Sequence, residues 1–186
     1  MKETPQTVID YECTECRLHK HRTNVVWGDG NHDAKIILVA EGPGRNEDEI
    51  GRAFAGLAGK TLDVFLNKVK LDRTKVLILN IVKCRPPDNR KPYNDESRIC
   101  GRFLEKQLEV AAEKKVIVAL GATAWEWFFS EDKGLKITDN HGKVKRYKGI
   151  KVVLSMHPSF VRRKHDKSIN KAFLSDLIKA KKIARR

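Results

Sequence analysis

Four short apolar runs recur along the chain, and helical patterns lie between them. The runs are rich in β-branched residues and cover Lys35–Ala40, Val76–Val82, Val116–Leu120 and Val152–Met156. Near-continuous hydrophobicity over such short lengths is typical of strands that are covered on both faces, as in a parallel sheet. The pattern therefore predicts four buried strands.

The segments between and after these runs have the periodicity of amphipathic helices. The predicted helices cover Gly59–Lys70, Asp95–Ala112, Ala122–Phe129 and Ile169–Ala184. Alternation of strands and helices predicts an α/β fold, specifically a three-layer α/β/α domain. We find no repeat, linker or low-complexity segment, so we expect one domain over residues 1–186 that includes the N-terminal cysteine segment and the basic C-terminal helix.

Polar or glycine residues stand at the end of each predicted strand. They are Glu41-Gly42-Pro43-Gly44, Asn80, Gly121 and His157-Pro158-Ser159, in chain order. Ligands of open parallel sheets bind at the carboxyl ends of the strands. The sequence therefore predicts a functional site at this edge of the sheet.

Positive charge is concentrated in the last third of the chain. Of the 186 residues, 40% are hydrophobic and 33% are charged, which is typical of a globular protein. The net charge is +14, and Lys133–Arg186 alone holds seventeen basic and three acidic residues. Solubility alone does not require such segregation, so we favour a nucleic-acid partner. The chain has no membrane-spanning run and no signal-peptide core, so we expect a cytoplasmic protein without a membrane partner.

The four cysteines are the candidate metal ligands. Cys13 and Cys16 form a C-x2-C pair, and Cys84 and Cys100 follow as a more open pair. Disulfides are rare in the cytosol, so this pattern favours a metal. Zinc usually takes two tight pairs, whereas the open second pair suits an iron–sulfur cluster. From the spacing, an iron–sulfur cluster, zinc and free structural thiols all stay open.

Six motifs in a fixed order resemble those of one enzyme family. They are CTEC, EGPGRNEDEIGRAFAGLAGKTLD, NIVKCRPPDNRKP, a later cysteine, LGATA and HPSFVRR. From Cys13 to about Arg163 the chain resembles the family 4 uracil-DNA glycosylases, the iron–sulfur branch of their superfamily. The resemblance implies a central four-stranded parallel sheet and a structural 4Fe–4S cluster held by the four cysteines. It also implies hydrolytic release of uracil from single- or double-stranded DNA, which leaves an abasic site. We expect a monomer, and the sequence does not identify a protein partner such as a sliding clamp.

The resemblance assigns the substrate pocket to four residues. Enzymes that act on a DNA base take it out of the stack into a pocket. Asn80 is the candidate reader, because a carboxamide can both donate to and accept from the polar edge of uracil. Phe54 is the candidate floor on which the base stacks. Gly42 and Pro43 are further candidates for substrate binding, and the backbone N–H groups near Gly42 are predicted to help stabilise the departing anion.

Three further residues are candidates for catalysis. His157 is predicted to stabilise the negative charge on the departing uracil, as a neutral imidazole that donates one hydrogen bond. Glu41 and Asn89 are alternative candidates for positioning the attacking water, and each also has a purely structural interpretation. Better-studied members of the superfamily have an aspartate in the corresponding motif, which leaves the water-activating residue open.

The segment after His157 is the candidate DNA clamp. Phe160 and Val161 are predicted to form an apolar loop tip that fills the gap left by the flipped base. Arg162, Arg163 and Lys164 follow and are predicted to hold the DNA backbone. Two other functions stay open: a glycosylase for another deaminated base such as hypoxanthine, and a non-catalytic DNA-binding module with the same fold.

Overall fold

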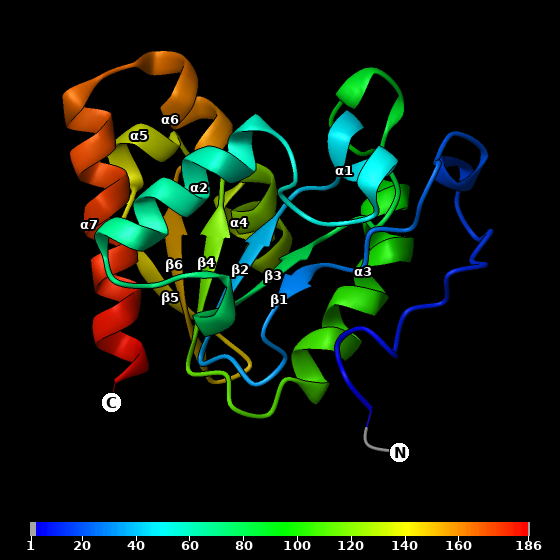
Figure 1. The fold of residues 1–186 in the computed structure, drawn as a ribbon, viewed down its shortest axis with the longest axis horizontal. Helices are drawn as coiled ribbons and strands as arrows, with labels where there is room; N and C mark the ends of the chain where they lie inside the picture. Colours follow the sequence, from blue (N-terminus) through cyan, green and yellow to red (C-terminus); the bar gives the residue numbers. More distant parts are fainter. Residues whose placement is uncertain (1–2, 186) are drawn as a thin grey trace.

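The fold is built on one twisted sheet between two layers of helices (Figure 1). The computed structural model describes residues 3–185, and over this range the sheet has six strands in the order β1-β3-β2-β4-β6-β5. Both ends of the predicted 1–186 domain lie outside the described residues. The strands are β1 (Asp29–Gly30), β2 (Ile36–Ala40), β3 (Val76–Asn80), β4 (Val116–Leu120), β5 (Val144–Tyr147) and β6 (Ile150–Ser155).

The four central strands are parallel, as the sequence predicts. β3, β2, β4 and β6 lie side by side in this order, and every residue of β2, β3 and β4 is buried. In this register Ala40 pairs with Asn80, and Leu120 pairs with Ser155. The carboxyl ends of the four strands therefore meet at one edge of the sheet.

The prediction of only four strands is wrong at the two edges of the sheet. β1 and β5 pair antiparallel with β3 and β6, so the sheet is mixed. β1 has two residues, which is too short to produce an apolar run. β5 alternates between exposed and half-buried residues and turns into β6 through Lys148 and Gly149, both of which have positive φ angles. Such a two-residue turn suits the twist of a hairpin.

Helices cover both faces of the sheet, which confirms the three-layer prediction. α2 and α7 pack on one face, where the ring centroids of Phe65 and Phe173 lie 5.0 Å apart. α3 and α4 pack on the other face through Leu104 and Trp125, which are fully buried. The α-helices are α1 (Arg45–Ile50), α2 (Leu57–Lys68), α3 (Asn94–Val110), α4 (Ala122–Phe128), α5 (Ile137–Asn140), α6 (Pro158–Lys164) and α7 (Lys167–Ala184). Short 3₁₀ helices are η1 (Arg17–Lys20), η2 (Arg73–Lys75), η3 (Pro87–Asn89) and η4 (Ser130–Asp132).

The segment predicted as an apolar loop tip is a helix instead. Phe160 and Val161 lie in α6, which begins at Pro158. Proline is favoured in the first turn of a helix, and His157 caps that turn by accepting the backbone N–H of Ser159. Val161 is only 2% exposed and packs in the core, so its side chain is not available to enter DNA.

A search for membrane-spanning helices over residues 3–185 found none of sufficient length and hydrophobicity.

Candidate active site

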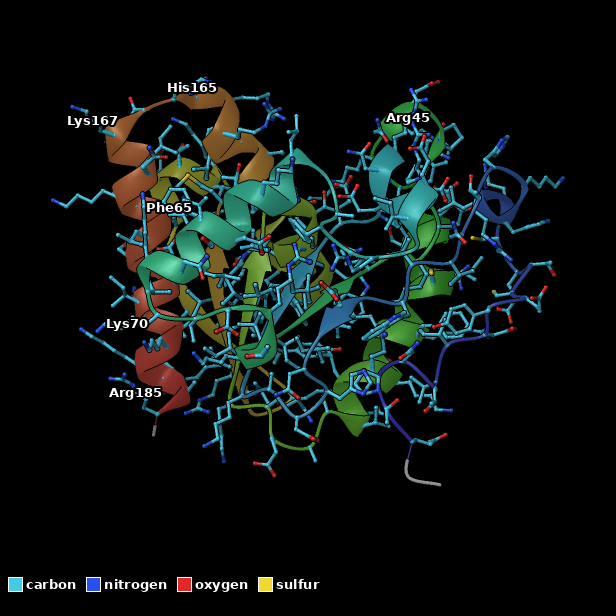
Figure 2. The ribbon with its side chains drawn as sticks, viewed as in Figure 1. Arg45, Phe65, Lys70, His165, Lys167 and Arg185 are labelled. Atoms are coloured by element: carbon cyan, nitrogen blue, oxygen red, sulfur yellow. The ribbon has the colours of Figure 1, made fainter. Side chains whose placement is uncertain are left out.

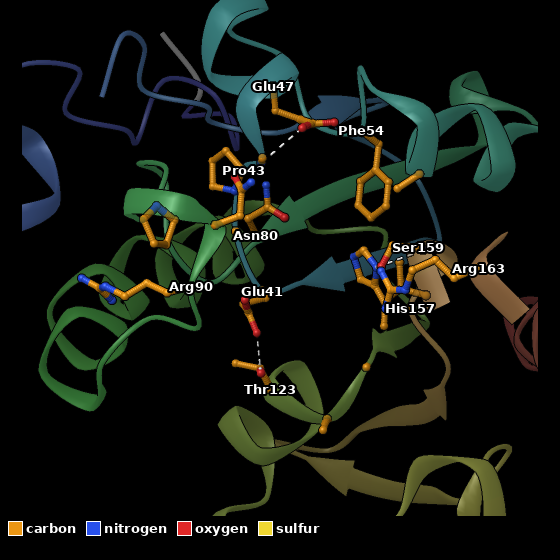
Figure 3. Close-up of a pocket in the computed structure, with 18 residues that line it drawn as sticks. Glu41, Pro43, Glu47, Phe54, Asn80, Arg90, Thr123, His157, Ser159 and Arg163 are labelled. Carbon is orange, nitrogen blue, oxygen red and sulfur yellow. Dashed lines mark hydrogen bonds between the residues drawn. The ribbon is translucent and has the colours of Figure 1, made fainter. Parts of the chain in front are cut away.

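A cavity of about 510 Å³ lies at the carboxyl ends of the parallel strands (Figure 3). It is bordered by the loops that follow β2, β3 and β4 and by the start of α6. Eight of the predicted site residues line it: Glu41, Gly42, Pro43, Phe54, Asn80, Asn89, His157 and Arg163. The structure thus brings together, around one cavity, residues that are far apart in the chain.

Asn80 ends β3 and faces this cavity with an unpaired amide oxygen. Its side chain is 2% exposed, and its Oδ1 is the one buried side-chain nitrogen or oxygen in residues 3–185 without a hydrogen-bond partner. The backbone oxygen of Asn80 accepts from the ammonium of Lys83 at 2.5 Å. An unsatisfied buried polar atom is costly, so this oxygen is ready for an external donor.

Phe54 and His157 lie opposite Asn80 and near each other. The two ring centroids are 5.5 Å apart with an interplanar angle of 28°. Phe54 has a φ angle of 52°, in the left-handed region that bulky residues rarely adopt. Its ring is buried and forms one side of the cavity.

His157 is held as a neutral ring. Its Nδ1 accepts the backbone N–H of Ser159 at 3.2 Å and lies 2.8 Å from the Ser159 hydroxyl. Because Nδ1 is an acceptor, the proton of the neutral ring resides on Nε2. Burial, assisted by the positive charge of Arg163, lowers the pKa of His157 to about 4.

The two candidates for positioning water differ in how they are held. The hydroxyl of Thr123 donates to Glu41 Oε2 at 2.5 Å, which fixes this carboxylate at the cavity wall. Asn89 is exposed, and its amide oxygen accepts from Arg85 Nε at 2.8 Å. Asp88 and Asn89 both have left-handed backbones, so their loop is tightly turned.

Glu47 connects two loops of the cavity, a role that the sequence analysis did not identify. Its carboxylate accepts the backbone N–H of Gly44 at 3.1 Å and that of Gly56 at 2.8 Å. Figure 3 shows Glu47 above Pro43, with its hydrogen bond to the loop before α1. The second bond, to Gly56, attaches the loop that carries Phe54. A glutamate three residues after a helix cap was the available signal, because it is the spacing of a capping box.

The predicted clamp residues lie on different sides of α6. Arg163 lines the cavity, whereas Arg162 is exposed to solvent and is not among the residues that line the cavity. The ammonium of Lys164 lies 5.7 Å from the ring centroid of Phe160. Beyond α6, the basic side chains Lys167 and Arg185 mark the two ends of α7 (Figure 2).

The four cysteines lie around a second, much smaller cavity of about 20 Å³. Cys13 and Cys16 are partly exposed, and Cys84 and Cys100 are buried. The backbone N–H of Lys83 donates to the Cys100 sulfur at 3.2 Å. Burial raises the pKa of the Cys100 thiol to about 12.

The side chain of Arg22 lies beside these sulfurs. Arg22 donates to the Cys84 sulfur at 3.6 Å and to the backbone oxygen of Cys13 at 2.6 Å. Within residues 3–185, no three or more His, Cys, Asp or Glu side chains form a preformed site for a metal ion. The four predicted ligands thus line one cavity without forming a preformed metal site, and what they bind stays a prediction.

Comparison with known proteins identifies the family. A profile of the Uracil DNA glycosylase superfamily matches residues 27–180. The chain is 45% identical over 171 residues to the Type-4 uracil-DNA glycosylase of Thermotoga maritima, which covers 91% of this chain and 88% of the relative. It is 43% identical to that of Archaeoglobus fulgidus, over 80% of this chain and 77% of the relative. It is 40% identical to that of Sulfurisphaera tokodaii, over 79% and 70%. The chain belongs to the type-4 uracil-DNA glycosylases of the uracil-DNA glycosylase superfamily.

Proposed function

We propose that this DNA-repair hydrolase binds an extruded uracil between Asn80, Phe54 and His157 and breaks its bond to deoxyribose. The family assignment makes the protein a uracil-DNA glycosylase. The roles of individual residues are our proposal, and one observation carries it. The buried Oδ1 of Asn80 faces the cavity without a partner.

Asn80 distinguishes uracil from cytosine by the direction of two hydrogen bonds. Its Oδ1 accepts the N3–H of uracil, and its Nδ2 donates to O4. Cytosine has an acceptor at N3 and a donor at its amino group, so the same amide would meet two mismatched groups. A mismatched buried polar pair costs more than a missing one, which supports strong discrimination.

Phe54 and His157 act on the base and on the charge that it acquires. The base stacks on the Phe54 ring, which contributes affinity without selecting the base. When the C1′–N1 bond breaks, its electron pair stays on uracil and the negative charge spreads to O2. The Nε2–H of neutral His157 donates to that oxygen and stabilises the transition state.

Glu41 is the better of the two candidates for positioning water. Water adds to C1′ of the sugar, and its proton needs an acceptor. The Glu41 carboxylate lines the cavity and is oriented by Thr123, whereas the Asn89 amide oxygen is already bonded to Arg85. A carboxylate also stabilises the positive charge that develops on the sugar.

We propose that Cys13, Cys16, Cys84 and Cys100 hold a 4Fe–4S cluster. The donor set fits, because four thiols line one cavity and Arg22 and Lys83 supply hydrogen bonds to two of the sulfurs. When bound, the cluster supplies structural cross-linking: it attaches the N-terminal segment to the loop after β3 and to α3. The reaction needs no electron transfer from it.

DNA reaches the cavity along the basic side of the molecule. Arg162, Arg163 and Lys164 in the last turn of α6 contact the phosphates next to the flipped nucleotide. The basic excess of residues 133–186 extends this field. We propose that the protein acts as a monomer on uracil in single- or double-stranded DNA.

The reader assignment is tested with Asn80→Ala on oligonucleotides that carry one uracil. Loss of two hydrogen bonds of about 1–1.5 kcal/mol each predicts a fall in kcat/KM of roughly 100-fold. Full uracil release by this variant would show that Asn80 is not the reader.

Parallel substrates separate the alternatives. Wild-type protein is expected to release uracil and to leave thymine and hypoxanthine in place. Release of hypoxanthine at a comparable rate would assign a broader glycosylase. Tight binding of every oligonucleotide with no base release would assign a non-catalytic module.

A further inference from the structure

The backbone of Phe54 is held in an unfavourable conformation by contacts that come from outside its loop. Its φ angle of 52° lies in the left-handed region, where an aromatic residue is a genuine outlier. Such conformations persist only when the surrounding structure fixes them, and they cluster at functional sites. The loop of Phe54 therefore requires a specific restraint.

Arg73 supplies this restraint. One of its terminal nitrogens, Nη2, donates to the backbone oxygen of Phe54 at 2.7 Å, and Nη1 donates to that of Ala53 at 3.0 Å. A guanidinium that donates to two successive carbonyls fixes the orientation of the peptide units on either side of Phe54. The planar fork of arginine suits this task, and the single ammonium of lysine does not.

Arg73 is itself fixed by two carboxylates. Its Nε and Nη2 donate to Asp63 at 2.9 and 3.2 Å, and its Nη1 also pairs with Asp29. The Arg73 side chain is 20% exposed, so these ion pairs are partly shielded from water. Asp63 belongs to α2 and Asp29 to β1. The guanidinium thus joins the Phe54 loop to a helix and to an edge strand.

Two other contacts limit where the loop can lie. A Cβ atom on Gly59 would stand 1.7 Å from the Phe54 oxygen, so α2 approaches this carbonyl more closely than any other residue type permits. On the opposite side, Glu47 holds the N–H of Gly56. Gly59 and Glu47 therefore restrict the position of the loop, and Arg73 binds the carbonyls of Ala53 and Phe54.

We propose that Arg73 is a positioning residue that sets the stacking floor of the pocket at a fixed place relative to the reader. η2, which contains Arg73, leads directly into β3, and Asn80 ends that strand. The segment from Arg73 to Asn80 therefore contacts the Phe54 loop at its first residue and carries the proposed reader at its last residue. This inference rests on the proposed role of Phe54 as the floor.

The expected consequence is a defect in the pocket rather than in DNA binding. Without the guanidinium, Phe54 relaxes toward a negative φ angle and its ring moves from under the base. We expect Arg73→Gln to lower kcat/KM on uracil DNA by about 10- to 100-fold and to weaken inhibition by free uracil by a similar factor. Affinity for an abasic oligonucleotide should stay within about twofold, since no phosphate contact is lost.

The experiment compares five variants by single-turnover rate, inhibition by free uracil and melting temperature. Arg73→Gln and Arg73→Lys test the fork, and Phe54→Ala tests the floor. Lys75→Gln is the matched control, because it removes a cation of the same short helix that pairs with Asp72 at 3.1 Å. We expect Arg73→Lys to be nearly as impaired in rate and uracil inhibition as Arg73→Gln, and Lys75→Gln to behave as wild type. Soluble guanidinium at non-denaturing concentration should rescue the rate of Arg73→Ala.

The outcomes separate this inference from the proposed function. If Phe54→Ala retains full uracil inhibition and rate, Phe54 is not the floor. If Phe54→Ala is impaired while Arg73→Gln matches wild type in both, the positioning role is wrong. If Arg73→Gln does not fold, Asp63→Asn serves instead: a loss of about threefold in uracil inhibition supports the proposal, and wild-type inhibition overturns it.

Discussion

At the scale of single residues, His157 shows how the backbone sets the protonation of a side chain that we propose to be catalytic. The same ring caps α6 through Nδ1 and faces the cavity. Accepting a backbone N–H requires an unprotonated Nδ1, and burial near Arg163 disfavours the charged ring. A neutral hydrogen-bond donor is therefore available at neutral pH.

The depressed pKa of His157 predicts a loss of stability in mild acid. The unfolded chain binds a proton near the ordinary pKa of 6.5, whereas the folded ring does so only at about 4. The contribution to stability is therefore present above pH 6.5 and is lost as the pH falls through this window, by at most about 3 kcal/mol. Urea unfolding across this range measures it. His157→Gln should lose less stability on acidification, and an equal loss in both proteins would contradict the assignment.

The same pKa predicts how activity depends on pH. Because His157 stays neutral, kcat/KM should show no inflection from this residue between about pH 5 and about pH 8. The measurement is a pH profile of single-turnover rates for the wild type and His157→Gln. An inflection near pH 6.5 that disappears in His157→Gln would mean that the folded ring titrates normally.

At the scale of elements, α6 has one side in the core and another in solvent. Val161 packs into the core, and Arg162 on the next position is exposed to solvent. The motif HPSFVRR places an apolar pair before a basic run, which is equally compatible with a loop tip and with a short amphipathic helix. Only the packing of α6 against α2 and α7 distinguishes the two, because Val161 has partners there.

Substitutions on the two faces of α6 should therefore separate stability from DNA binding. Val161→Ala removes buried methyl groups and is expected to lower the free energy of unfolding by about 2 kcal/mol, with DNA affinity nearly unchanged. Arg162→Gln should leave stability within about 0.5 kcal/mol and reduce the slope of log K against log salt by about one. Thermal melts and salt-titrated binding check both. A Val161→Ala protein of full stability and weak DNA binding would restore the wedge interpretation.

The edge strands illustrate another limit of local pattern. The central strands are apolar throughout, so their sequence identifies them. β1 and β5 exist because the exposed edges of β3 and β6 offer unpaired backbone groups. Their own residues are mostly polar, and they produce no signal in a search for apolar runs.

At the scale of the whole molecule, the basic residues and the cysteine segment lie in different parts of the chain. Basic excess lies in residues 133–186, which contain α6 and α7, and the cysteine segment lies at the opposite end of the chain. The four cysteines come from the N-terminal segment, the loop after β3 and α3, and they line one cavity. That residues 1–186 form one domain stays a prediction.

The cluster assignment predicts a measurable cofactor. Aerobically purified protein should contain about four iron and about four labile sulfide per chain and absorb visible light. Cys100→Ser should lose this absorbance and melt at a lower temperature, since the N-terminal segment is then no longer attached to α3. One equivalent of zinc without iron would contradict the assignment and favour a single-ion site.

Local pattern was enough for the four central strands and for helices α2, α3, α4 and α7, and motifs that resemble a known family pointed to most residues of the pocket. Apolar periodicity, charge runs and short motifs are properties of neighbouring residues, so they can be recognised without coordinates. The unpaired oxygen of Asn80, the inward face of α6 and the contact of Arg73 with the Phe54 carbonyl required the folded chain. Arg73 and Phe54 are nineteen residues apart, and Gly59 of α2 also lies against the Phe54 carbonyl. No local pattern encodes a distance between two such groups, because it depends on how the whole sheet and its helices pack.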